Sequence, residues 1–279
     1  MSAIYEIIET LLPFEWLSHT FMKNAFIALL IASPLFGMLG NFIVSRGMAF
    51  YSDAIGHSSL TGVALGVIFG FRDITLAMVI FSALLGFAII AVKSRGSSRH
   101  DTIIGVFSSI AMALGIVLLS AGGNFAKYQR YLVGDILSIQ PNEIALLFAV
   151  AIIVTLVWIF FYNKLFLISL HENIAKSRGI SVFAIEQLFA ILTAIVVTLA
   201  IRWTGLLVIN SLLVLPAASS RLVSQNSRTY FLFSILISLF SSIAGLASSF
   251  YFGSSAGAAI VLANAVFFFA CLAIKVVRK

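Results

Sequence analysis

Cysteine is almost absent from this chain. Cys271 is the single cysteine among 279 residues. A disulfide or a thiolate metal cluster within one chain is therefore excluded. Any metal site that this polypeptide builds must use nitrogen and oxygen ligands.

Charged residues are scarce as well. They make up 10% of the chain, and hydrophobic residues make up 61%. An ordinary soluble domain has roughly 25% and 45–50% of these classes, so the surplus apolar surface must face lipid. The apolar residues form long uncharged blocks, and a helix crosses the bilayer core in about 20 residues. We predict an all-α, polytopic membrane protein with about nine (eight to nine) transmembrane helices. The expected spans are residues 21–45, 53–71, 74–93, 102–121, 142–163, 182–201, 203–221, 229–251 and 256–275.

A basic region is missing from the first residues, which instead contain Glu6, Glu9 and Glu15. This composition does not fit a cleaved signal peptide. We expect residues 1–20 to form an interfacial helix and residues 21–279 to form one transmembrane domain.

Sequence motifs for chemistry on nucleotides or peptide bonds are also lacking. The chain has no GxxxxGK[ST] phosphate loop, and no HExxH, GxSxG or GxGxxG motif in a suitable setting. We therefore do not expect an enzyme, and we expect ATP hydrolysis, if required, to take place on another chain. No permanently bound cofactor is expected.

The net charge of +7 comes from basic residues at the ends of the apolar blocks. With nine spans, most of them fall on one side, and the few on the other side include Lys127 and Arg130. The positive-inside rule then predicts an external N-terminus and a cytoplasmic C-terminus. This pattern explains the charge better than nucleic-acid binding, which we do not expect.

The second expected span carries the most informative polar residues. Asp53 and His57 are four residues apart, so they share one helix face, and Thr61 continues the line. A carboxylate inside a membrane usually faces protein or water and marks a transport path. Zinc and manganese accept imidazole and carboxylate ligands. The alternative is that Asp53 caps the helix while a neighbouring carbonyl satisfies His57.

Three glycines repeat on the other side of this span. Gly62, Gly66 and Gly70 recur every four residues, roughly opposite the polar line. Small residues at this spacing favour close helix packing in membranes.

A loop over residues 169–181 follows the fifth span. Its residues from His171 to Arg178 can form a short amphipathic helix that ends at Gly179. Such a helix either lies on the membrane surface or docks on another protein. His171 and Glu172 resemble a metal pair, but we interpret them as solvated loop residues.

The segment from Gly205 to Leu222 contains Asn210 and Pro216. Pro216 removes a backbone hydrogen bond, so the segment is expected to be the least regular span, either broken or re-entrant. Asn210 either lines a pathway or joins helices through hydrogen bonds, and the second role is favoured.

Several segments together resemble one family, the permease subunits of bacterial zinc and manganese ABC importers. The segments that carry the resemblance are SRGMAFYSDAIGHSSLTGVALGVIFG, YLVGDILSIQ, ENIAKSRGISV, TGLLVINSLLVLPAASSRL and SSAGAAIVLANAVFFF. The resemblance covers nearly the whole chain, and it rests on the order and spacing of these segments.

This resemblance implies a multi-pass protein of the cytoplasmic (inner) membrane. It implies a second permease copy, two ABC ATPase subunits, and an extracytoplasmic metal-binding protein. It also implies that Asp53 and His57 are the ligands of the transported ion. The loop helix would then contact the ATPase through His171, Glu172, Lys176, Arg178 and Gly179.

The choice of metal depends on few residues. Manganese-type members usually carry a motif close to DAISHAVLPG, whereas DAIGHSSLTG in this chain is more similar to zinc-type members. Zinc is therefore favoured over manganese.

Two other classes of function remain open alongside the importer. A self-contained secondary metal transporter would need intramembrane acids for ion coupling, and only Asp53 and Glu186 are candidates. An intramembrane enzyme would need further ligands and a general base, and none is visible.

Overall fold

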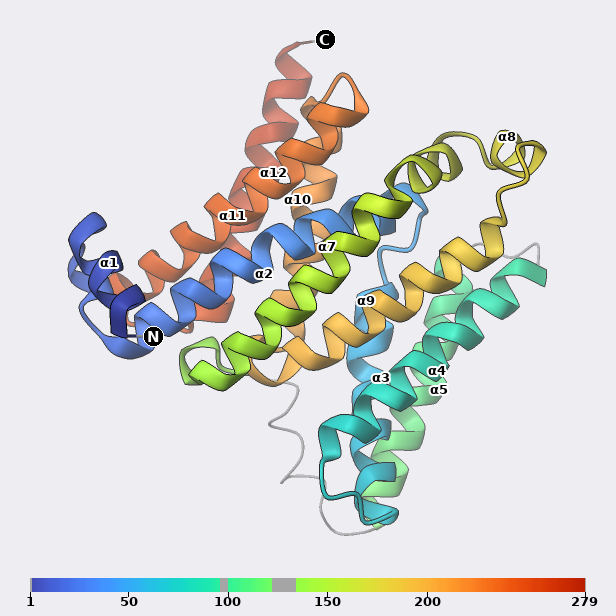
Figure 1. Cartoon of the computed structure of the whole chain (residues 1–279), viewed down its shortest axis with the longest axis horizontal. Coiled ribbons are helices and arrows are strands. Elements are labelled where there is room, and N and C mark those ends of the chain that lie inside the picture. The colour runs from blue at the N-terminus through green and yellow to red at the C-terminus, as the bar shows by residue number, and fades with distance from the viewer. Residues whose placement is uncertain (1, 96–99, 122–133, 279) are drawn as a thin grey trace. The chain divides into compact units, whose positions relative to one another are not determined.

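A computed structural model describes residues 2–95, 100–121 and 134–278 of the chain (Figure 1). These residues form helices and connecting turns, without a β-strand in the described ranges. The basic residues Arg99, Lys127, Arg130 and Lys279, which entered the prediction of orientation, lie outside them. The helices are α1 (Ser2–Leu11), η1 (Glu15–Leu17), α2 (Thr20–Ser45), α3 (Tyr51–Ile68), α4 (Ile74–Arg95), α5 (His100–Ala121), η2 (Ile136–Ser138), α7 (Pro141–Leu170), α8 (Glu172–Ser177), α9 (Val182–Thr204), α10 (Leu206–Val223), α11 (Ser227–Phe252) and α12 (Ala256–Val277).

Each of the nine expected spans coincides with one long helix, which confirms the all-α fold class. Within the described residues, eight helices are long and apolar enough to cross a membrane. The remaining long helix is α3, whose apolar character is reduced by Ser52, Asp53, His57, Ser58 and Ser59. The polar residues that made this span informative also set it apart by composition.

Helix contacts divide the chain into two compact units, each assembled from separate stretches of sequence. The first unit comprises residues 1–41, 135–153 and 203–279. In it, the backbones of α2 and α10 approach so closely that a Cβ atom added at Gly40 would lie 1.8 Å from the carbonyl oxygen of Leu213. The hydroxyl of Ser33 on α2 donates to Ser242 on α11 over 2.8 Å. Small residues thus bring these helices together, as expected for packing in a membrane.

The N-terminal helix α1 belongs to this first unit and is attached to the start of α2. Glu9 forms an ion pair with Lys23, and the Tyr5 hydroxyl donates to the side chain of Asn24. The interfacial position expected for residues 1–20 stays a prediction.

The second unit comprises residues 42–134 and 154–202 and is built around α3, α4, α5 and α9. The hydroxyl of Tyr51 at the start of α3 donates to the carbonyl of Ala190 on α9 over 2.9 Å. The short helix α8 lies between α7 and α9 in the chain (Figure 1).

The segment expected to be broken or re-entrant is a regular helix in the structure. α10 runs without interruption from Leu206 to Val223 and contains Pro216. The irregularity lies instead at Gly205, which alone separates α10 from α9 and has a φ of 78°. Glycine adopts this left-handed conformation without the steric cost that a Cβ atom would bring.

Candidate metal site on α3 and a buried charge cluster

Asp53 and His57 lie on one face of α3, one turn apart. The His57 Nε2 atom is 3.5 Å from Oδ1 of Asp53. The Asp53 side chain is 38% exposed and the His57 side chain is 25% exposed. Phe50 is the N-cap residue of α3, so Asp53 is the third residue of the helix and not its cap. The structure thus brings the two expected metal ligands together on an accessible face.

The face of α3 that carries Asp53 opens onto a cavity of about 490 Å³. The first residues of α3 and the first three turns of α5 line this cavity. Its lining residues are Phe50, Asp53, Asp101, Thr102, Ile104, Gly105, Ser108 and Ser109. Asp53 therefore faces a space that an ion can enter, and the carboxylate and hydroxyl oxygens along its wall are ligands for divalent metals.

The described part of the chain holds few candidate metal ligands close together. The described part of the chain contains no group of three or more His, Cys, Asp or Glu residues placed to bind one metal ion. A zinc site usually needs at least three protein ligands. Asp53 and His57 would thus supply two of the ligands that such a site needs.

The opposite side of α3 packs against α4, as the glycine spacing predicts. A Cβ atom at Gly62 would lie 2.6 Å from Cα of Met78, and one at Gly66 would lie 2.9 Å from Cβ of Ala77. Gly70 does not belong to this contact, which corrects the prediction for the third glycine. It follows the end of α3, has a φ of 67°, and no atom lies within 4 Å of an added Cβ.

Thr61 and Asn210 were expected to have a weak role in lining a pathway. Thr61 is buried, and its hydroxyl donates to the carbonyl of Ala111 on α5. This contact joins two helices and favours a packing role for Thr61, and its role in a pathway stays a prediction. Asn210 is half-buried on α10 in the first unit.

The loop of residues 169–181 contains the predicted short helix. α8 spans Glu172–Ser177, and Gly179 has a φ of 74°. The Ile180 N–H donates to the carbonyl of Ala175 over 3.0 Å, a bond that satisfies one of the last helical carbonyls. The helix and its glycine termination are therefore confirmed, and His171 directly precedes the helix.

Glu172 is more than a solvated loop residue, which corrects that interpretation. Its carboxylate contacts Lys176 Nζ at 2.8 Å and Arg46 Nη2 at 2.9 Å. Hydrogen bonds from Lys176 and then from Arg46 stabilise the ionised form, so the pKa of Glu172 falls to about 2. Glu172 is thus fixed as a carboxylate between its own helix and the end of α2.

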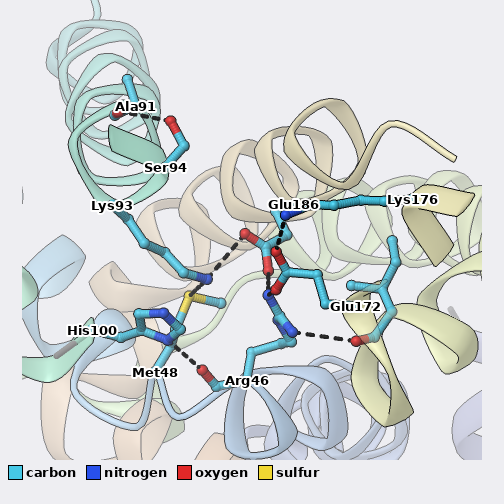
Figure 2. Close-up of polar contacts among 10 residues, drawn as sticks. Arg46, Met48, Ala91, Lys93, Ser94, His100, Glu172, Lys176 and Glu186 are labelled. Carbon is cyan, nitrogen blue, oxygen red and sulfur yellow. Dashed lines mark hydrogen bonds and ion pairs between the residues drawn. The ribbon is translucent and has the colours of Figure 1, made fainter. Parts of the chain in front are cut away.

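The Arg46 guanidinium belongs to a buried cluster that the sequence did not reveal (Figure 2). Arg46 also pairs with Glu186 at the start of α9, and Lys93 Nζ at the end of α4 lies 3.0 Å from Oε2 of Glu186. In the sequence, Arg46 and Lys93 counted only as basic residues at span ends. The available signal was Glu186 itself, because a carboxylate inside an apolar helix needs a buried cation.

Comparison with known proteins agrees with this fold. Residues 18–275 match the family model described as the ABC 3 transport family. The manganese import system permease protein ScaB of Streptococcus gordonii is 32% identical over 248 residues, which cover 89% of each chain. The high-affinity zinc uptake system membrane protein ZnuB of Haemophilus influenzae is 29% identical over 240 residues, 86% of this chain and 92% of the relative.

A solved structure is similar over almost the same length. It is PsaBC from Streptococcus pneumoniae in complex with Fab, with a TM-score of 0.77 and 30% identity. The match covers 97% of this chain and 95% of the solved chain. From the family match and the agreement in fold, the chain belongs to the ABC 3 transport family.

Proposed function

We propose that the chain is the permease subunit of an ATP-driven importer that moves a divalent transition metal across the cytoplasmic membrane. The observation that carries this proposal is the Asp53 and His57 pair on a helix beside a cavity. The family match over residues 18–275, and relatives named for manganese import and zinc uptake, support the same cargo.

The transported ion binds between two copies of the chain in this proposal. A two-fold axis would bring a second Asp53 and His57 pair to the first, which gives two carboxylates and two imidazoles. Such a set suits zinc or manganese. Each half alone holds the ion weakly, so the ion is released when the two halves separate.

The remaining partners follow from the same proposal. Two ATPase subunits supply the energy, since this chain has no phosphate loop. An extracytoplasmic metal-binding protein delivers the ion. The N-terminus lies outside and the C-terminus in the cytoplasm, and α8 contacts the ATPase through a surface that includes His171, Lys176 and Arg178.

Zinc is the favoured cargo and manganese the second candidate. The motif DAIGHSSLTG around the two ligands is the basis of this preference. The relatives include proteins named for each metal, so direct comparison of the two ions is part of the test.

A secondary transporter is less well supported. It would use an intramembrane acid to couple an ion gradient to transport. Glu186, one of two candidates, is buried and paired with both Arg46 and Lys93. A carboxylate held by two cations is poorly suited to bind and release a coupling ion.

Reconstitution into lipid vesicles tests the function. We expect zinc or manganese uptake only when the ATPase subunits, the binding protein and ATP are all present. The purified chain alone should hydrolyse no ATP. Metal uptake driven by a proton or sodium gradient, without the ATPase subunits, would contradict the proposal and support the secondary transporter.

A further inference from the structure

Three charged side chains are buried where the end of α2, the end of α4 and the start of α9 meet. The side chains of Arg46, Lys93 and Glu186 are 10%, 6% and 6% exposed. Removing charges from water is costly, and apolar residues of similar volume often stabilise a fold equally well or better. Stability alone therefore explains this cluster poorly. Holding the surrounding segments in one arrangement explains it better.

The buried side chains of Arg46, Lys93 and Glu186 carry one net positive charge, which Glu172 on α8, itself paired with the exposed Lys176, helps to offset. Arg46 and Lys93 contribute two positive charges, and Glu186 contributes one negative charge. Glu172 on α8 supplies the second negative charge through its 2.9 Å contact with Arg46. If α8 moved away, the buried group would keep an uncompensated positive charge, which is unfavourable. The positions of α8 and Arg46 are therefore energetically linked.

Arg46 lies in the turn that leads from α2 to α3. Its carbonyl accepts a 2.8 Å hydrogen bond from Nδ1 of His100 at the start of α5. Two residues later, the Met48 sulfur lies 3.8 Å from Lys93 Nζ. Figure 2 shows these contacts around the turn. The turn thus has contacts with α4, α5 and α8, and a movement of Arg46 displaces its backbone.

Asp53 follows this turn closely. α3 begins at Tyr51, so Asp53 is in its first helical turn, seven positions after Arg46. Because a helix is stiff, a displacement of the turn shifts the Asp53 carboxylate as well. Glu172, Arg46 and the turn therefore form a continuous path within the second unit, from α8 to the metal-ligand face of α3.

We propose that the Glu172–Arg46 ion pair transmits a movement of α8 to Asp53, so that the ATPase cycle weakens the hold on the transported ion. This inference rests on the proposed function, in which α8 contacts the ATPase and Asp53 binds the cargo. Arg46 is a positioning residue, because it acts on the ligand through the turn. In this proposal Glu172 acts through Arg46 and not as part of the ATPase contact that the resemblance implied for it, because its carboxylate is already held by Arg46 and Lys176.

Glu172→Gln tests this path, because it removes the charge that reaches Arg46 and keeps the size of the side chain. The complex of the permease variant with its co-expressed ATPase subunits is reconstituted with the binding protein. Metal transported per ATP hydrolysed is then measured with zinc and with manganese. We expect this ratio to fall at least about fivefold, the lower range of coupling between two sites. ATPase retention during purification and the rate of ATP hydrolysis should stay near wild type.

Glu143→Gln is the matched control. It makes the same chemical change in the carboxylate of the half-buried Glu143 on α7, which accepts a hydrogen bond from the backbone N–H of Gln140 over 3.0 Å. We expect it to transport as much metal per ATP as the wild type. The wild-type complex itself must show ATP-dependent uptake. If it does not, the proposed function is contradicted as a whole, and not only the path through Glu172 and Arg46.

Arg46→Lys provides a second variant that keeps the positive charge. A lysine ammonium lacks the planar fork with which Arg46 holds Glu172 and Glu186 together. We expect the same loss of transport per ATP, with a melting temperature near that of the wild type. The double variant that combines Arg46→Lys with Glu172→Gln should transport at least as much metal per ATP as the more impaired of the two single variants.

Three results would overturn the proposal. The first is that Glu172→Gln transports as much metal per ATP as the wild type, in an experiment in which the wild-type complex is active. The second is a loss of ATPase retention that accounts for the whole defect, since Glu172 would then belong to the docking surface. The third is multiplication of the two single defects in the double variant, because independent effects multiply whereas steps on one path do not.

Discussion

His57 Nε2 lies 3.5 Å from Oδ1 of Asp53, across one turn of α3. The other ring nitrogen, Nδ1, is buried and has no hydrogen-bond partner among the described residues. The alternative explanation of this pair required a neighbouring carbonyl to satisfy His57, and such a carbonyl is not found there. The side chains of His57 and Asp53 are 25% and 38% exposed, so the pair is accessible from outside the helix.

Removal of either ligand should stop transport. We expect Asp53→Asn and His57→Ala to abolish uptake of zinc and manganese into vesicles, while the assembly with ATPase subunits is retained. Asparagine is a poorer metal ligand and does not offset the charge of the ion, yet it caps a helix as well as aspartate does. Near-normal uptake by both variants would refute the site.

Asp73→Asn is the control for the Asp53 variant. The Asp73 carboxylate accepts a 2.9 Å hydrogen bond from the backbone N–H of Thr75 at the start of α4. Asparagine can accept the same bond, so we expect uptake by this variant to match the wild type.

Charge reversal on α8 should separate ATP hydrolysis from transport. Lys176→Glu together with Arg178→Glu should weaken association with the ATPase, because docking surfaces depend on complementary charge. The measurement is ATPase retention and metal uptake in reconstituted vesicles, with Lys275→Glu on α12 as the control. Unaltered coupling in the double variant would mean that α8 does not dock on the ATPase.

The close approach of α2 and α10 should make Gly40 intolerant of substitution. In Gly40→Ala the new Cβ would lie 1.8 Å from the Leu213 carbonyl oxygen, so one backbone must move. Overpacking of this kind costs about 1–3 kcal/mol. Thermal melting in detergent should show a lower midpoint. Gly105→Ala on α5, which has no atom within 4 Å of the new Cβ, should leave the midpoint unchanged or raise it.

Glu172 should not respond to pH in the range where transport is measured. Its folded-state pKa of about 2 lies below the ordinary pKa of a glutamate. The stabilisation from its ion pairs is therefore fully present above the ordinary pKa and is lost as the pH falls toward 2. The ratio of wild-type to Glu172→Gln transport per ATP should therefore be constant from about pH 8 to about pH 5. A ratio that approaches one near pH 6 would show that Glu172 titrates there.

Local pattern was enough to predict most of this fold from the sequence. Apolar block length located the long helices within a few residues, except that α7 continues to Leu170 and not only to residue 163. Turn chemistry predicted the end of α8 at Gly179. Spacing alone put Asp53 and His57 on one face. Each of these features depends on residues that are close in the chain.

The features that were missed depend on contacts between distant segments. Arg46 and Glu186 are 140 positions apart, and no periodicity connects them. Thr61 has the spacing of a pathway residue, but its partner is Ala111 on α5. Pro216 suggested a broken helix, whereas α10 continues through it and the helix boundary lies at Gly205.

The polar composition of α3 also has a consequence for how the protein is made. α3 is the long helix that is not apolar enough to count as a span by itself, unlike α4 and α5, which follow it. During synthesis it should leave the translocon only when these more apolar helices can cover its polar residues. A nascent chain ending just after α3 should thus remain extractable from the membrane by alkali in a span-by-span insertion assay. Extension through α5 should make α3 resistant to extraction, so the helix with the proposed metal ligands would enter the bilayer together with α4 and α5.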